Sequence, residues 1–155
     1  MRRACFCAVA LLIACRTPPK LPPIDLSQAG WQVQQGQAVW KPNKNAPELS
    51  GELVWAAHPD GRFLLQFLKT PITLVEAQGS KDAWQISFPP QGRTLSGVGQ
   101  LADARGSVQR LGWLYLARGL QGQALTRQWT FSGTADAWKL ANARTGEVIE
   151  GFLRP

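Results

Sequence analysis

From Trp31 onward the sequence is a succession of short segments in which apolar and polar residues alternate, separated by Gly, Pro, Asn and Asp. Because side chains of a strand point alternately to the two faces of a sheet, this pattern predicts successive antiparallel strands with one apolar face each. The expected strands cover residues 31–40, 49–57, 62–69, 72–77, 83–88, 93–99, 126–132, 137–142 and 147–153. Between the strands 49–57 and 62–69, the segment from His58 to Gly61 is predicted to form a tight turn.

One segment, 107–118, has helical spacing instead. Its periodic apolar residues are Val108, Leu111, Leu114 and Tyr115. Ser107 is the expected N-cap, and Gly119 and Gly122 are expected to end the helix. Its broad apolar surface predicts burial against the sheet. We therefore predict a mainly β fold, in which a curved antiparallel sheet of about nine strands, an incomplete β-barrel, packs against one main α-helix.

The chain begins with a basic Met1-Arg2-Arg3 followed by an unbroken apolar run, residues 4–14. This is the pattern of a signal peptide, and the run is too short for a transmembrane helix, which needs roughly 20 residues. Residues 12–15 (LIAC) resemble a bacterial lipobox. The resemblance implies cleavage between Ala14 and Cys15 and a Cys15 that carries acyl chains, palmitate among them. The alternatives are a secreted protein cleaved elsewhere, with an incidental thiol at Cys15, or a start codon placed wrongly upstream.

The lipobox divides the chain into a signal peptide (1–14), a lipidated tether (15–30) and one domain (31–155). Four prolines between positions 18 and 23 predict an extended, stiff tether that lifts the domain off the membrane. Arg16 follows the cysteine where an inner-membrane retention signal would have Asp. We therefore expect a lipid-anchored protein of the outer membrane that faces the periplasm.

Composition disfavours most catalytic chemistry. Cys5 and Cys7 are expected to leave with the signal peptide, and the single histidine, His58, lies in a predicted turn. Glu147 and Glu150 are three apart in a predicted strand and point to opposite faces, so they cannot form an acid/base pair. We expect no enzyme activity, no metal and no cofactor. From Arg16 to Arg154 the basic residues are spread singly, which does not indicate nucleic-acid binding.

The seven tryptophans point to apolar binding instead. One helix is expected to cover only part of so wide a sheet, which would leave an apolar cleft. An acyl chain of about 16 carbons could gain at most roughly 13 kcal/mol on entering it, at about 0.8 kcal/mol per methylene. The expected cavity wall consists of Trp55, Phe63, Leu65, Phe67, Trp84, Ile86, Phe88, Leu111, Leu114, Trp129, Phe131 and Trp138.

The run from Glu48 to Pro89, with the later helix, Trp129 and Trp138, resembles the lipoprotein-localisation (Lol) carrier and receptor superfamily. The resemblance implies a half-barrel with a helical lid that holds lipoprotein acyl chains, and a receptor that is itself a lipoprotein. Two features depart from the family pattern. The usual helix before the first strand is replaced by the tether, and the loop 69–72 is short where the receptor has a protruding apolar residue. Leu68 or Ile72 are candidates for that residue, although burial at the strand end is the simpler role.

These observations predict a membrane-anchored protein that binds or hands over lipid or acylated protein without catalysis. The alternative is an accessory lipoprotein of an envelope complex, with a filled core, a protein partner and no lipid ligand.

Overall fold

The computed structural model describes residues 20–99, 111–134 and 136–155. Its strands and helices run in the order β1 (Gln32–Lys41), β2 (Leu49–Ala57), β3 (Phe63–Lys69), β4 (Ile72–Gly79), β5 (Ala83–Phe88), a 3₁₀ turn η1 (Pro89–Gln91), β6 (Arg93–Val98), α1 (Gly112–Leu120), β7 (Trp129–Thr134), β8 (Ala137–Asn142) and β9 (Val148–Arg154). The predicted class is confirmed, with nine antiparallel strands in one sheet and one α-helix among the described residues.

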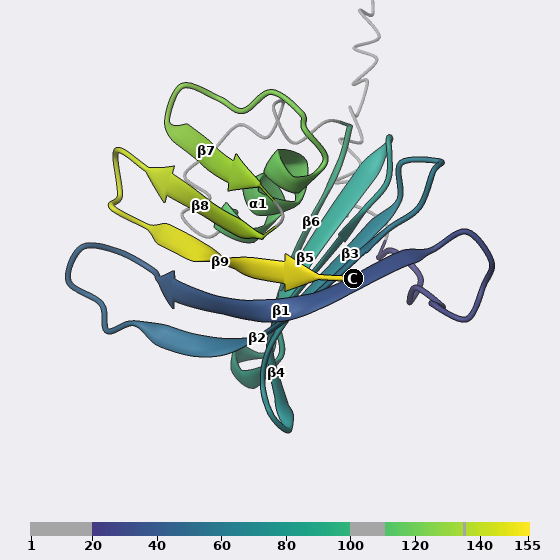
Figure 1. Ribbon diagram of the computed structural model, residues 1–155. Helices are drawn as coiled ribbons and strands as arrows, with labels where there is room; N and C mark the ends of the chain where they lie inside the picture. Colours follow the sequence, from purple (N-terminus) through teal and green to yellow (C-terminus); the bar gives the residue numbers. More distant parts are fainter. Residues whose placement is uncertain (1–19, 100–110, 135) are drawn as a thin grey trace, which may run out of the picture.

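The strands are ordered β6-β5-β4-β3-β2-β1-β9-β8-β7, so β1 pairs with both β2 and the last strand, β9. The sheet does not close into a barrel, because β6 and β7 remain as its two edges. It curves strongly, and α1 lies between its two halves (Figure 1). The helix contacts β3 and β4 on one side and β7 and β8 on the other. The concave face is therefore built around the helix.

β1 and β9 approach each other closely at two glycines. A Cβ at Gly36 would collide with the carbonyl oxygen of Phe152, and a Cβ at Gly151 would collide with that of Gln37. Glycine in a strand interior often marks a bend or a close approach of another backbone. These two glycines let the central strands approach where the sheet turns.

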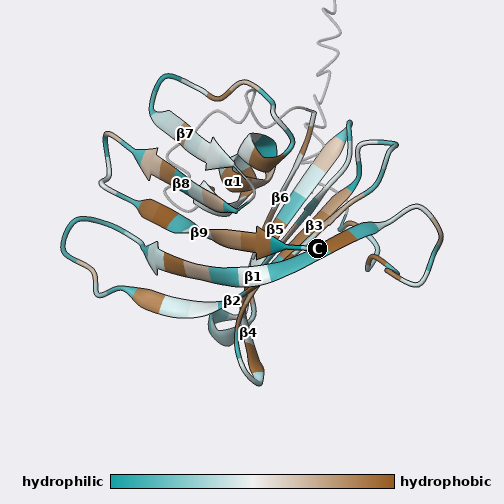
Figure 2. Cartoon of the chain, in the orientation of Figure 1, coloured by the Kyte–Doolittle hydropathy of each residue, from teal (hydrophilic) through white to brown (hydrophobic). Residues whose placement is uncertain are grey.

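Alternation along the strands separates the two faces, and Figure 2 shows strands such as β9 changing between apolar and polar residues along their length. In β2, Leu53 and Trp55 are buried on the concave face, whereas Ser50 and Glu52 are exposed on the outer face. β3 departs from this pattern, because Leu64 is buried as well as Phe63 and Leu65, so both of its faces carry buried apolar residues.

The helix differs from its prediction. It begins at Gly112, with Leu111 at the N-cap position, and Ser107 and Val108 lie outside the described residues. The prediction that Gly119 ends the helix is wrong. A Cβ at Gly119 would lie 2.6 Å from Cδ2 of Phe131, so the glycine provides room for that ring within the last turn. Gly122, with φ of +70°, follows the helix end.

Several strand bounds also shift. β4 continues to Gly79 rather than ending at 77, and β7 begins at Trp129 rather than at 126. The first of these shifts has a visible cause, because Gly79 pairs with both Phe63 and Trp84 and so belongs to the ladder.

The described part of the expected tether, residues 20–30, is not a free spacer. The backbone N–H of Leu21 donates a hydrogen bond to Oε1 of Gln85 at 3.0 Å. Gln85 faces outward on β5 and is nevertheless only 5% exposed. Residues 20–25 have no regular secondary structure, whereas residues 26–30 form turns, so the expectation of an extended segment does not hold for its second half.

Candidate functional site

The expected cavity wall lies on the concave face around α1. Ten of its twelve residues are buried in the hydrophobic core and two are partly buried against that core. The buried members are Trp55, Phe63, Leu65, Phe67, Trp84, Ile86, Phe88, Leu111, Leu114 and Trp138, and the partly buried ones are Trp129 and Phe131. The structure thus brings the predicted side chains together, but most of them pack against one another in the hydrophobic core and do not line an open cavity.

Trp113 is the reason that so much of the wall is core. Its side chain is fully buried and stacks on Phe67, with ring centroids 4.7 Å apart, while its centroid lies 5.5 Å from that of Trp40. One indole from the helix thereby fills the middle of the concave face. Trp113 is not among the residues of the expected cavity wall. The large volume of its side chain is the feature of the sequence that indicates its role in filling the concave face.

A pocket of about 650 Å³ remains at one end of the sheet. Phe63, Trp84 and Leu114 from the predicted wall line it, together with residues of two turns and of the segment after α1. The turn residues are Gly61, Ser80, Lys81 and Asp82, and the remaining lining residues are Gly99, Arg118, Gln121, Gln123 and Ala124. We call this the end pocket. Its volume is within the range of about 300–1,000 Å³ that is usual for small-molecule sites.

Two aromatic rings form the apolar wall of the end pocket, and each lies on a glycine of the neighbouring strand. Phe63 packs over Gly79, where a Cβ would be 2.6 Å from Cε1 of the ring. Trp84 packs over Gly97, where a Cβ would be 2.5 Å from Cε2 of the indole. Glycine in a strand often marks a bulge, a bend or close packing, and at Gly97 the structure shows close packing. Trp55 stacks on Phe63 from within the core, which fixes this wall.

Charged side chains form the rim of the end pocket. Lys81 and Asp82 come from the β4–β5 turn, and Arg118 comes from the last turn of α1. The Nε of Arg118 is buried and has no hydrogen-bond partner. A cation in the last turn of a helix is favoured by the partial negative charge of that end.

A buried carboxylate lies at the other end of α1. Glu147 is 1% exposed, and its Oε1 accepts a hydrogen bond of 2.9 Å from Nε1 of Trp40. A Cβ at Gly112, the first helical residue, would be 2.5 Å from the same oxygen. The carboxylate therefore lies against the helix N-terminus, where negative charge is favoured. Glu150, by contrast, is exposed and pairs with Lys139 at 2.9 Å, so the two carboxylates occupy different surroundings.

The outer face also carries a groove, which spans two adjoining hollows of about 430 and 520 Å³. Both hollows are lined by Val39, Glu150, Gly151 and Phe152, and Trp138 of the predicted wall lines the second. At the β3–β4 turn nearby, Ile72 is 55% exposed and Leu68 is half-buried.

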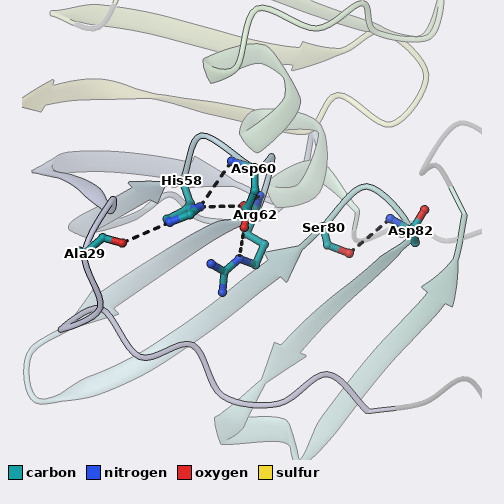
Figure 3. A network of polar contacts seen from close by, with 6 residues as sticks. All are labelled: Ala29, His58, Asp60, Arg62, Ser80 and Asp82. Carbon is teal, nitrogen blue, oxygen red and sulfur yellow. Dashed lines mark hydrogen bonds and ion pairs between the residues drawn. The ribbon is translucent and has the colours of Figure 1, made fainter.

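The single histidine lies in a turn, as predicted. The backbone N–H of Gly61 donates to the carbonyl of His58 at 3.0 Å. The His58 ring lies 2.9 Å from a carboxylate oxygen of Asp60 and 3.3 Å from the carbonyl of Ala29, so it links the N-terminal segment to the turn (Figure 3). The Asp60 carboxylate also accepts from the backbone N–H of Arg62, which is the largest cause that lowers its pKa to about 2.

The described ranges contain no group of three or more His, Cys, Asp or Glu side chains placed to hold a metal ion. None of the helices in these ranges is long and apolar enough to span a membrane. No protein-family model matches the chain, and a search of curated proteins found no match.

Proposed function

We propose that this protein is a lipid-anchored envelope protein that binds an acyl chain, from a lipid or an acylated protein, and passes it on without catalysis. Two sets of observations support the proposal. Residues 12–15 resemble a lipobox, and the half-open sheet carries a pocket beside its helix that is lined by both apolar and polar residues.

The observation that carries the proposal is the end pocket. Phe63, Trp84 and Leu114 give it an apolar wall, and its volume is about 650 Å³. An acyl chain that enters such a site gains about 0.8 kcal/mol for each buried methylene. About six methylenes would thus contribute about 5 kcal/mol before the costs of binding. The pocket lies at an end of the sheet, where a chain can enter without displacing Trp113.

Photolabelling tests this proposal in the full chain, held in phospholipid nanodiscs. A 16-carbon fatty acid with a diazirine on its chain is titrated, and the labelling yield is measured. Ala124 is exposed and lines the end pocket, so Ala124→Trp fills the pocket without altering a core side chain. We expect this variant to lose labelling, whereas Ala143→Trp, at an exposed site elsewhere, retains it. Equal labelling of both variants would refute binding in the end pocket.

Lipidation at Cys15 has its own test. The intact mass of the protein made in a bacterium should match a chain that begins at Cys15 and carries acyl groups. A retained leader or an unmodified thiol would refute the anchor.

The filled concave face and the outer groove favour a second candidate, an accessory lipoprotein that contacts a partner protein through the sheet. Trp113 leaves little of the core open, and Phe152 and Val39 supply apolar contacts in the groove. If this second candidate is correct, Phe152→Glu should abolish the function of the protein in cells, whereas Ala124→Trp should leave that function intact.

A further inference from the structure

The end pocket has two chemical halves, and the second half specifies its ligand further. Phe63, Trp84 and Leu114 form the apolar wall, whereas Lys81 and Arg118 place two cations at the rim. We infer that the pocket takes a single acyl chain with a free carboxylate, whose head group is held by Arg118 and Lys81. This inference rests on the proposed function and narrows its ligand to a fatty acid rather than an acylated protein.

Arg118 is available for such a head group. Among the described residues it takes part in none of the ion pairs, which involve His58, Asp60, Arg62, Lys139 and Glu150. Its Nε–H is removed from solvent and has no acceptor. Arg118 as a whole is partly exposed and lines the pocket, so a ligand there can contact the residue. A carboxylate fits because it can accept two parallel hydrogen bonds from a guanidinium.

Lys81 adds a second cation to the same rim. Its aliphatic stem lies against Gly61, because a Cβ there would be 3.4 Å from both Cγ and Cε of the lysine. Lysine commonly packs its stem on the protein surface while keeping its charged end in water. Asp82 lines the pocket as well and opposes an anion. Two cations against one carboxylate leave the rim with a net positive charge.

The head group discriminates between the two ligand classes of the proposed function. A diacylglyceryl group on a cysteine is uncharged. It would therefore enter the pocket without offering Arg118 a negatively charged hydrogen-bond acceptor. A fatty acid supplies both the chain and the carboxylate. Hydrogen bonds to charged groups contribute about 1.5–3 kcal/mol, which corresponds to an affinity difference of about ten- to a hundredfold.

The test compares two photoreactive ligands on the full chain in nanodiscs, a 16-carbon fatty acid and the alcohol of the same length. For the unaltered protein, we expect the acid to reach half-maximal labelling at a concentration that is lower than that of the alcohol by a factor of about ten or more. Both concentrations are corrected for partitioning of the ligand into the disc. Arg118→Gln should remove this preference and leave labelling by the alcohol unchanged. Arg118→Lys retains the charge and should keep part of the preference, and Asp82→Asn should strengthen binding of the acid.

The outcomes separate the inference from the function on which it rests. Equal labelling by acid and alcohol, or an Arg118→Gln protein that still prefers the acid, overturns the head-group site while acyl-chain binding stands. Labelling by neither ligand overturns both. Circular dichroism of each variant checks the fold, and the alcohol serves as an internal control for a distorted pocket.

Discussion

Truncation of Trp113 tests how the concave face is filled. The side chain is fully buried, stacks on Phe67 at 4.7 Å and meets Trp40 edge-on at 5.5 Å. A buried tryptophan removes about 150–250 Å² from water, which at about 25 cal/mol per Å² corresponds to about 4–6 kcal/mol. Measured truncations of buried Phe or Trp to Ala cost about 3–5 kcal/mol. We therefore expect Trp113→Ala to lower the free energy of unfolding by about 4 kcal/mol.

The assay is equilibrium unfolding of residues 20–155 in urea, followed by far-UV circular dichroism, since the substitution changes the tryptophan fluorescence. Trp113→Leu provides a matched variant. Nε1 of Trp113 has no hydrogen-bond partner, so leucine loses area but no polar contact, and about half of the destabilisation should return. Trp31→Ala, at a half-buried residue outside the core, should cost about 1 kcal/mol. A loss below about 1 kcal/mol for Trp113→Ala would refute the filled core.

Three further predictions address the pocket, the buried carboxylate and the turn. Gly97→Ala should push the Trp84 indole into the end pocket and weaken fatty-acid labelling in a photolabelling titration. Gly92→Ala serves as a control for backbone strain, because Gly92 has open space around its Cβ position but a φ of +59°, so it should lower stability and leave labelling unchanged. Trp40→Phe removes the donor to Glu147 and should cost about 1–3 kcal/mol in urea unfolding; a neutral result would show that the bond contributes nothing. The pKa of Asp60 is lowered from 3.8 to about 2, so the stability that it contributes is fully present above about pH 4 and is lost as the pH falls through about 2. The difference in unfolding free energy between the unaltered protein and Asp60→Asn should therefore shrink over this interval, and a constant difference would contradict the hydrogen bonds assigned to this carboxylate.

Local pattern was sufficient for much of the fold. The strands 49–57, 83–88 and 137–142 match their predictions to the residue, because apolar and polar side chains alternate along them and turn residues bound them. The pairing of β1 with β9 could not be predicted in this way, since it joins segments far apart in the chain. The role of Gly119 was also hidden, because it depends on the position of the Phe131 ring.

For the candidate site, too, local pattern predicts some features, whereas others depend on contacts between distant segments. Alternation placed Phe63 and Trp84 on one face, and helical spacing placed Leu114 opposite them. The pattern could not show that Trp113 fills the centre of this face, or that Lys81 and Arg118 both line the end pocket. Both depend on how the helix packs across the sheet, which periodicity alone does not specify.

The central claim is that an acyl chain binds in the end pocket, and the position of a photolabel tests it most directly. After labelling of the full chain with the diazirine fatty acid, peptide mass spectrometry should find the adduct on peptides that carry Phe63, Trp84 or Leu114. An adduct confined to the outer groove, around Val39 and Phe152, or no adduct at all, would contradict the claim.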